Sequence, residues 1–309
     1  MKDYTLKYGK GSVTFALDEA HVTELYGTPV PKIDDIRAAL YATLSSPVSH
    51  EPLESWVNPG DKVALIVSDM SRFWMRQDLV VPHIISYLTD KCDVNHNNIT
   101  IIIANGTHPG GDENELRTLV TDGVYDRIRV VNHDCQAKDL VYIGTTSLGT
   151  EVRINPIAAN ADKVIMLGAC TYHVMAGYGG GRKSILPGIS GLETIRQNHL
   201  HSLDLLAPRS NPLIGNGVTD GNPLNEDMCQ AAAMVKNLFG INLVTNADMQ
   251  LAHIISGDPM KAWQLACHRV DEIYRVPIVK KADVIITSCG GYPKDMSLYQ
   301  GTKIIDNVE

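Results

Sequence analysis

A histidine, a run of glycines and a lysine lie within one short stretch of the chain. The stretch reads Thr171-Tyr-His-Val-Met-Ala-Gly-Tyr-Gly-Gly-Gly-Arg-Lys-Ser184, so His173 and Lys183 flank the glycines. Glycines cost backbone entropy and bury no side chain, so a chain carries several together mainly where its backbone approaches something closely. Successive backbone N–H groups in such a loop can bind a phosphate. We therefore expect a ligand site here, with a flexible surface loop as the alternative.

The same residues come close to the P-loop pattern G-x-x-x-x-G-K-[ST]. The segment Gly177–Ser184 reads Gly-Tyr-Gly-Gly-Gly-Arg-Lys-Ser, so Arg182 stands where the last glycine belongs. Pro187 and Gly188 follow soon after the lysine, where a P-loop needs a long helix. The sequence therefore argues against nucleotide hydrolysis.

Three histidines have positions that suit proton transfer or ligand binding. His108 lies in a turn after an apolar run, and His199 stands in a predicted helix. Taken singly, each has a structural interpretation, as a turn cap or a packed helical side chain. A histidine works as a general base near pH 7 without a large pKa shift. Together with His173 and Lys183, these two residues indicate an enzyme site.

One pair of polar residues is a candidate for substrate binding, and a further trio carries no prediction by itself. Asp69 and Arg72 follow an apolar run, and an arginine binds a carboxylate through two parallel hydrogen bonds. A surface salt bridge is the alternative for this pair. Tyr299 and Lys303 are four residues apart on one face of a predicted helix, with Gln300 beside them.

Apolar, β-branched runs predict the elements that position these residues. The predicted strands are Lys62–Asp69, Ile99–Asn105, Arg127–Asn132, Lys163–Gly168, Ile241–Asn246 and Asp283–Ser288. Continuous apolar runs suit strands covered on both faces, and helical segments separate several of them. We therefore predict an α/β fold with a largely parallel sheet. Ligands of such sheets bind outside the carboxyl ends of the strands, where the candidate residues cluster.

Two helices have clear start signals. Ser190 and Glu193 form a capping box, with Ser190 as the N-cap of a helix over residues 191–201. Asp258 before Pro259 predicts the start of a helix that runs to about Tyr274.

The predicted domain boundary follows the second of these helices, at Pro277. We expect a large N-terminal domain over residues 1–275 and the beginning of a second α/β domain over residues 276–309. A helix is predicted to begin at Asp295, and the sequence stops inside its periodic pattern. The second domain is therefore expected to be incomplete.

Composition narrows the class of protein. A hydrophobic content of 44% and a charged content of 20% are typical of a globular protein. The formal charge of -8 argues against nucleic acid or an anionic membrane as a partner. The six cysteines include no CxxC pair, the start of the chain has no apolar signal region, and no run approaches the ~20 apolar residues of a membrane span. These features predict a cytoplasmic location with reduced thiols.

Spaced motifs along almost the whole chain carry a resemblance to a known family. They are Asp69-Met-Ser-Arg72, Asn105-Gly-Thr-His-Pro-Gly110, Asn132-His-Asp134, His173 through Lys183-Ser184, Pro187-Gly188, Glu193-Thr194, Asn198-His199, Gly221-Asn-Pro-Leu224, Glu226-Asp-Met228, Gly290-Gly-Tyr-Pro-Lys-Asp295 and Leu298-Tyr-Gln-x-x-Lys303. The chain resembles the nickel-pincer lactate racemase family, whose members racemise or epimerise 2-hydroxy acids.

The resemblance implies a cofactor and a role for each candidate residue. The family uses a nicotinic-acid-derived mononucleotide with two sulfur-containing groups that coordinate nickel. One of these groups is joined to a lysine, and Lys183 matches that lysine. His199 matches the nickel ligand, and His108 and His173 match the acid and base. The resemblance gives the other candidates binding roles: Gly179, Gly180, Gly181, Asp69 and Ser184 for the cofactor, and Arg72, Tyr299, Gln300 and Lys303 for the substrate. The implied partners are a small 2-hydroxy acid and the enzymes that synthesise the cofactor.

The implied chemistry agrees with the residues. The Cα–H of a 2-hydroxy acid is too weakly acidic for a simple histidine base, whereas hydride transfer with loss of the hydroxyl proton gives a planar keto acid. Return of hydride to the other face inverts the carbon, and two histidines let the reaction run both ways. Imidazole and sulfur donors suit nickel.

The chain departs from the family near Arg72, where Phe73-Trp74-Met75-Arg76 follows in place of an expected nearby proline. This departure would either reshape the substrate pocket or add a second cation to it through Arg76. Two alternatives stay open at this point. An NAD-dependent dehydrogenase would need G-x-G-x-x-G after a strand, which the first half of the chain lacks. A truncated, non-catalytic homologue that binds a nucleotide or a partner is the other.

Overall fold

The computed structural model describes residues 1–292 and Asp295, which form parts of two compact units. One unit comprises residues 1–28 together with 274–309, and the other comprises residues 29–273. The predicted division of the chain between residues 275 and 276 stays a prediction. The larger unit contains every candidate site residue that the structure describes.

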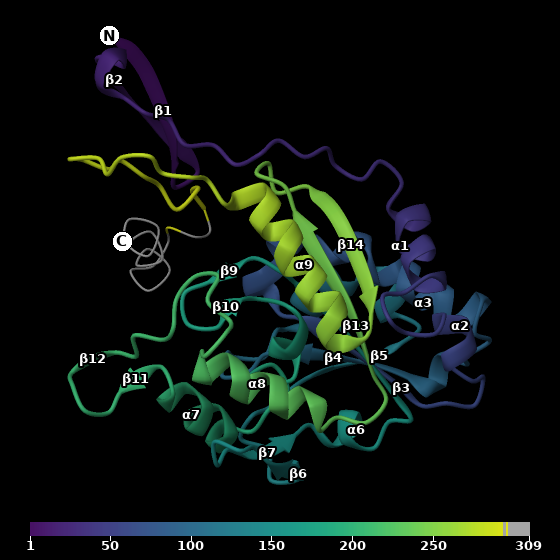
Figure 1. Ribbon diagram of the computed structural model, residues 1–309. Coiled ribbons are helices and arrows are strands. Elements are labelled where there is room, and N and C mark those ends of the chain that lie inside the picture. Colours follow the sequence, from purple (N-terminus) through teal and green to yellow (C-terminus); the bar gives the residue numbers. More distant parts are fainter. Residues whose placement is uncertain (293–294, 296–309) are drawn as a thin grey trace. The chain divides into compact units, whose positions relative to one another are not determined.

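A six-stranded sheet lies at the centre of the larger unit (Figure 1). Its strands, in spatial order, are β14 (Leu251–Gly257), β13 (Leu238–Thr245), β8 (Lys163–Ala169), β3 (Val63–Ser68), β4 (Ile99–Ala104) and β5 (Arg129–Asn132). Neighbouring strands are parallel throughout, except that β14 runs antiparallel to β13 at one edge. The predicted α/β fold with a largely parallel sheet is confirmed.

Strand β3 is apolar over almost its whole length because both faces of the sheet are covered. Alternate side chains of β3 point to opposite faces, as they must in an extended chain. Val63, Leu65 and Val67 belong to one hydrophobic cluster, and Ala64 and Ile66 belong to the other. Both clusters are shielded from water, which explains the continuous apolar runs in the sequence.

Helices form a layer on each face of the sheet (Figure 1). One layer contains α1 (Ile36–Ser45), α2 (Leu53–Trp56), α3 (Val81–Asp90), α4 (Glu113–Val120) and α5 (Asp122–Tyr125). The other contains α6 (Pro156–Ala159), α7 (Leu192–Leu200) and α8 (Pro223–Ala233). Helix α9 (Pro259–Tyr274) follows β14 and lies across β13 and β14 in Figure 1.

The predicted start of α9 is confirmed by its cap. Asp258 Oδ1 accepts hydrogen bonds from the backbone N–H groups of Met260 and Lys261, at 3.1 and 2.9 Å. These bonds satisfy two of the amide groups that have no partner inside the helix.

The predicted capping box of α7 is wrong by one residue. The N-cap is Gly191, which has no side-chain acceptor for a capping hydrogen bond, and Ser190 lies outside the helix. Ser190 is fully buried and its hydroxyl donates to the Ile185 carbonyl at 2.7 Å instead. A buried hydroxyl must find a partner, and the nearby carbonyl competes with the cap for it.

The predicted strand Asp283–Ser288 is also wrong. These residues have no regular secondary structure, and Val284, Ile285 and Ile286 are half or more exposed. An apolar run becomes a strand only when a neighbouring strand pairs with its backbone, and no described strand does so here. The helix predicted from Asp295 lies outside the described residues.

Four two-stranded hairpins complete the described strands. In the smaller unit, β1 (Lys2–Tyr8) pairs with β2 (Gly11–Leu17). In the larger unit, β6 (Val141–Thr145) pairs with β7 (Glu151–Ile154), β9 (Tyr172–His173) with β10 (Gly177–Tyr178), and β11 (Leu203–Asp204) with β12 (Arg209–Ser210).

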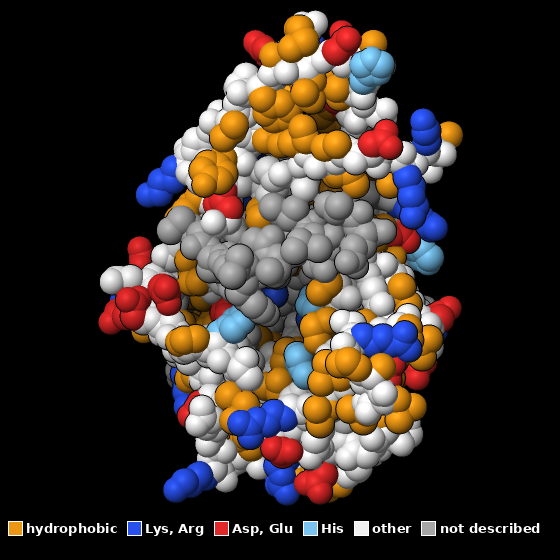
Figure 2. All heavy atoms as spheres, turned by 90° about the vertical axis from the view of Figure 1, so that its left-hand side faces the viewer, with side chains coloured by type: hydrophobic (Ala, Val, Ile, Leu, Met, Phe, Trp, Pro, Cys, Tyr) orange, Lys and Arg blue, Asp and Glu red, His pale blue; other side chains and the backbone are white. Residues whose placement is uncertain are grey.

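The smaller unit joins the two ends of the described chain. At the β1–β2 turn, the carbonyl of Gly9 accepts from the N–H of Tyr292 at 2.7 Å, and the N–H of Gly9 donates to Asp295 at 2.6 Å. Hydrophobic side chains gather over one side of this hairpin, at the top of Figure 2. Among the helices of the described residues, none has the length and apolar character needed to cross a bilayer.

Candidate functional site

The candidate residues follow the carboxyl ends of neighbouring parallel strands. Asp69 comes directly after β3, and His108 lies in the turn after β4. His173 follows β8, the neighbour of β3 on its other side. Parallel pairing puts these strand ends at one edge of the sheet, where α/β proteins bind their ligands. The edge predicted from the sequence is therefore present.

Asp69 and His108 form a hydrogen-bonded pair at this edge. His108 Nδ1 lies 2.6 Å from Asp69 Oδ2, and the hydroxyl of Ser71 donates to Asp69 Oδ1 at 2.6 Å. Burial raises the pKa of Asp69, but the hydrogen bonds from His108 and Ser71 outweigh it and leave that pKa below its usual value. The ionised carboxylate accepts the Nδ1 proton, so a neutral His108 has its lone pair at Nε2. The predicted contact of Asp69 with a cofactor stays a prediction.

His173 has the opposite arrangement of its ring nitrogens. It lies in β9, and its Nδ1 accepts the backbone N–H groups of Met175 and Ala176, both at 3.2 Å. An atom that accepts two N–H groups carries no proton itself. A neutral His173 therefore carries its proton on Nε2, whereas a neutral His108 carries it on Nδ1.

His199 and Lys183 are electrostatic neighbours. His199 stands on α7, and its Nδ1 donates to the Ile195 carbonyl of the preceding turn at 2.9 Å. Burial, followed by the charge of Lys183, lowers the pKa of His199. The ring is thus neutral at pH 7, and its lone pair is at Nε2. This is the state in which imidazole binds a metal.

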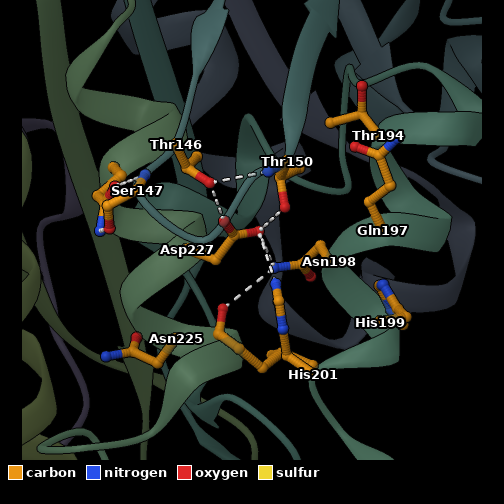
Figure 3. Close-up of polar contacts among 12 residues, drawn as sticks. Thr146, Ser147, Thr150, Thr194, Gln197, Asn198, His199, His201, Asn225 and Asp227 are labelled. Atoms are coloured by element: carbon orange, nitrogen blue, oxygen red, sulfur yellow. Dashed lines mark hydrogen bonds and ion pairs between the residues drawn. The ribbon is translucent and has the colours of Figure 1, made fainter.

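A buried polar network fixes the helix that carries His199 (Figure 3). Asp227 of α8 is fully buried and accepts hydrogen bonds from Thr146, from Thr150 at 2.9 Å and from Asn198 Nδ2 at 2.9 Å. Asn198 immediately precedes His199, so the carboxylate ties α7 to α8 and to the β6–β7 turn. Figure 3 shows that the His199 ring lies apart from this network and makes no hydrogen bond with it. Asp227 stands in the motif Glu226-Asp-Met228, but its role was not predicted, because an acidic residue in a helix usually faces solvent.

The glycine stretch is buried and closely packed. A Cβ on Gly181 would lie 2.7 Å from the Trp263 ring, and one on Gly177 would lie 2.4 Å from the Val218 carbonyl oxygen. The N–H of Gly179 donates to Thr171 O at 2.7 Å. Gly181 donates to Asn242 Oδ1 at 3.0 Å. Packing against the protein therefore accounts for these glycines, and a part in cofactor binding for Gly179, Gly180, Gly181 and Ser184 stays a prediction.

Arg182 lies at the centre of the glycine stretch and is fully buried. Its guanidinium donates to the carbonyls of Ala176 and Tyr178 at 2.7 and 2.8 Å, and twice to Asn225 Oδ1 at 3.0 and 2.7 Å. It also stacks 3.8 Å from the centre of the Trp263 ring. An arginine stands at the P-loop glycine position because its guanidinium holds the loop through hydrogen bonds to the loop carbonyls.

Arg72 and Arg76 have different surroundings. Among the described residues, the Arg72 guanidinium donates hydrogen bonds only to Ser71, through Nη1 to the carbonyl and hydroxyl at 3.3 and 3.1 Å. It therefore keeps most of its donors for a ligand. Arg76 makes two hydrogen bonds to Asp78, at 3.0 and 2.9 Å, so the expected second cation is engaged in its own segment.

The last features of the predicted site are the three substrate-binding candidates near the end of the chain and the metal ligands. Tyr299, Gln300 and Lys303 lie outside the described residues. No cluster of three or more His, Cys, Asp or Glu side chains among the residues that the structure describes is arranged to hold a metal ion. Histidine side chains, pale blue, lie near one another in the central part of Figure 2.

Comparisons with known proteins give the family of the chain. Residues 8–209 match the lactate racemase N-terminal domain family. The lactate racemase of Thermoanaerobacterium thermosaccharolyticum is 29% identical over 98% of this chain and 70% of that protein. The lactate racemase of Lactiplantibacillus plantarum is 28% identical over 96% of this chain and 69% of that protein.

Solved structures agree with this assignment. The lactate racemase apoprotein of Thermoanaerobacterium thermosaccharolyticum superposes with a TM-score of 0.86 at 28% identity, over 98% of this chain and 70% of that one. A protein from Thermotoga maritima superposes with a TM-score of 0.60 at 19% identity, over 81% and 61% of the two chains. The second likeness shows the fold alone.

Proposed function

Because the chain belongs to the lactate racemase family, we propose that it racemises or epimerises a small 2-hydroxy acid, using a nickel-pincer nucleotide attached at Lys183. The observation that supports the proposal most is the pair of histidines, His108 and His173, whose neutral rings present opposite groups at Nε2. One ring offers a lone pair and the other offers an N–H. Removal of the hydroxyl proton needs an acceptor, and a hydrogen-bond donor beside it orients the substrate oxygen.

The residues of the site fit the proposed cofactor. His199 presents a neutral Nε2, and imidazole is a suitable donor for nickel. The charge of Lys183 acts on that ring, so Lys183 and His199 would both hold the cofactor. When bound, the cofactor supplies a carbon that accepts hydride and returns it, with nickel held by sulfur donors and His199.

The residues of the chain supply binding and proton transfer. Arg72 binds the substrate carboxylate through its guanidinium. His108 Nε2 takes the hydroxyl proton as the substrate is oxidised to the keto acid. Asp69 stays ionised, accepts the hydrogen bond from Nδ1–H and balances the charge that the ring gains. The Nε2–H of His173 donates to the substrate oxygen in this direction.

For His173 to act as the base in place of His108, its tautomer must change. To accept a proton at Nε2, a neutral His173 must first place its proton on Nδ1, which accepts two backbone N–H groups in the structure. That tautomer loses both hydrogen bonds, which costs about 1 kcal/mol each. In the resting protein, His108 is therefore the base, and His173 donates a hydrogen bond to the substrate.

The decisive experiment is intact-mass analysis of protein produced together with the enzymes that synthesise the cofactor. We expect one adduct that maps to Lys183, bound nickel, and interconversion of the enantiomers of one or more 2-hydroxy acids in a chiral panel. Lys183→Arg should lose the adduct, whereas Lys163→Arg, on β8 beside the Trp56 ring, should keep it. Absence of both adduct and nickel from the unmodified chain would sink the proposal.

An isotope experiment tests hydride transfer separately. A substrate labelled with deuterium at C2 should keep its label after racemisation, because hydride returns to the carbon. Loss of the label to water would show proton abstraction instead. Consumption of NAD with release of free keto acid would favour a dehydrogenase.

A further inference from the structure

Two tyrosines of the hairpin that carries His173 share one carboxylate oxygen. The hydroxyls of Tyr172 and Tyr178 both donate to Asp271 Oδ1 of α9, at 2.7 and 2.6 Å. Tyr172 lies in β9 and Tyr178 in β10, and the two are directly paired across the strands. Their rings lie 5.4 Å apart. A single oxygen atom therefore holds both strands of the hairpin against α9.

The hairpin needs such an anchor because it is very short. Each strand has two residues, and an isolated two-stranded hairpin is only marginally stable in water. Burial, and then the hydrogen bond to Asp271, raise the pKa of Tyr178, so its hydroxyl stays a donor at any ordinary pH. Charge-assisted hydrogen bonds of this kind are about twice as strong as neutral ones.

The same hairpin decides the tautomer of His173. The N–H groups that His173 Nδ1 accepts belong to Met175 and Ala176, in the turn between the strands. His173 itself pairs with Gly177, the first residue of β10. A shift of β9 relative to β10 would therefore move the histidine away from both amide groups.

We propose that Asp271 is a positioning residue, which holds the β9–β10 hairpin through two tyrosine hydroxyls so that His173 keeps its proton on Nε2. Asp271 acts through the hairpin and takes no part in proton transfer. The functional meaning of the proposal rests on the proposed role of His173 in racemisation. Its structural content, one tautomer at His173 set by Asp271, is independent of that role.

The neighbouring residue offers a matched control. Glu272 follows Asp271 on the same helix, and its carboxylate pairs with Arg269 in solvent, at 2.9 and 2.7 Å. Replacement of either residue by alanine removes one carboxylate from the last turns of α9. Only Asp271→Ala removes a contact with the hairpin.

The test is long-range ¹H–¹⁵N correlation NMR of the histidine rings in the protein without substrate, with His173→Gln to assign the signal. We expect a single Nε2-protonated form of His173 in the unchanged protein and in Glu272→Ala, and a mixture of tautomers in Asp271→Ala. The His108 signals should stay the same in all three. Asp271→Asn keeps an acceptor oxygen and should restore the single form at least in part. A single unchanged tautomer of His173 in folded Asp271→Ala would overturn the proposal.

Two further measurements keep the test decisive. If Asp271→Ala fails to fold, Tyr172→Phe removes one of the two hydroxyls alone and should produce a smaller shift of the same tautomer equilibrium; no shift would overturn the proposal. With the loaded enzyme, Asp271→Ala should lower kcat by about 10- to 100-fold while KM changes little, because small displacements of a reacting group have effects of that order. If the unchanged enzyme racemises no 2-hydroxy acid, the proposed function fails. The NMR measurement of the His173 tautomer still tests the role of Asp271 in that case.

Discussion

Asp69 and His108 meet because β3 and β4 are in register. Ser68 and Ala104, the last residues of these strands, are direct partners in the sheet, so both following turns start at the same level. Asp69 is the first residue after β3, and His108 turns back to place Nδ1 at 2.6 Å from its carboxylate. The pair therefore depends on strand pairing, and the two residues lie 39 positions apart in the chain.

Asp69→Asn should lower kcat strongly while the protein stays folded. An asparagine amide can present its NH₂ to the ring, which places the proton of a neutral His108 on Nε2 and removes the lone pair there. We expect a loss of about 10²- to 10⁴-fold in kcat for racemisation, typical of a misdirected catalytic histidine. Asp78→Asn, which breaks the Arg76 pair instead, is the control and should stay within about threefold of the unchanged enzyme. Equal effects of the two substitutions would contradict the assigned pairing.

The contribution of Asp69 to stability should depend on pH in one direction. Its pKa is lower in the folded protein than in the unfolded chain, so the unfolded chain binds the proton more readily. The stabilisation is complete above the unfolded value of about 4 and is lost as the pH falls through the folded pKa. Urea unfolding of the unchanged protein and of Asp69→Asn should therefore differ most at neutral pH, with a difference that shrinks below about pH 4. A difference that grows with acid would refute the assignment.

Arg182→Met should destabilise the larger unit more than any surface arginine substitution. Methionine has a similar length but donates no hydrogen bond, so buried carbonyls such as those of Ala176 and Tyr178 lose their partner. Unsatisfied buried groups cost about 1–3 kcal/mol each, which predicts a loss of about 3 kcal/mol or more in the free energy of unfolding. Arg209→Met, which breaks an exposed pair with Asp204, should cost about 1 kcal/mol or less. Denaturant titration of both variants measures the contrast.

Gly181→Ala tests whether the glycine stretch is set by packing. Gly181 has a φ of +48°, and an added Cβ would meet Trp263 at 2.7 Å, so we expect a loss of about 2 kcal/mol or more. Gly123 in α5 has no atom within 4 Å of an added Cβ and an ordinary φ. Gly123→Ala should be neutral or stabilising by about 0.5 kcal/mol. Thermal unfolding of the two variants compares them, and a Gly181→Ala protein as stable as Gly123→Ala would refute the packing explanation.

The parallel sheet was predictable because its central strands, such as β3 and β8, are almost completely buried and leave continuous apolar runs. The run that became β4 contains isoleucines at four of its six positions, and such a run has few alternatives. The same signal misled at Val284–Ile286, because an apolar run does not reveal whether a partner strand exists. The antiparallel edge strand β14 was missed, since His253 and Ser256 interrupt its apolar pattern.

The candidate site was predictable at the level of residue type and strand position. Spacing along the chain placed His108 and His173 at the ends of strands, but no sequence pattern specifies which ring nitrogen carries the proton. That depends on Asp69 in one case and on two backbone N–H groups in the other. Asp271 and Asp227 were missed for a related reason: a helical aspartate that accepts buried hydroxyls looks in sequence like one that faces water.

The guanidinium of Arg182 has an effect beyond the hydrogen bonds that hold the glycine stretch. Burial lowers its pKa, but a guanidinium remains ionised in proteins. Its described hydrogen-bond partners are neutral oxygens, such as those of Asn225 and Tyr178, which do not cancel the charge. In a medium of low permittivity, the field of that charge extends farther than it would in water. The residue next to Lys183 thus contributes a positive charge to the edge of the sheet at which the ionised carboxylate of Asp69 lies.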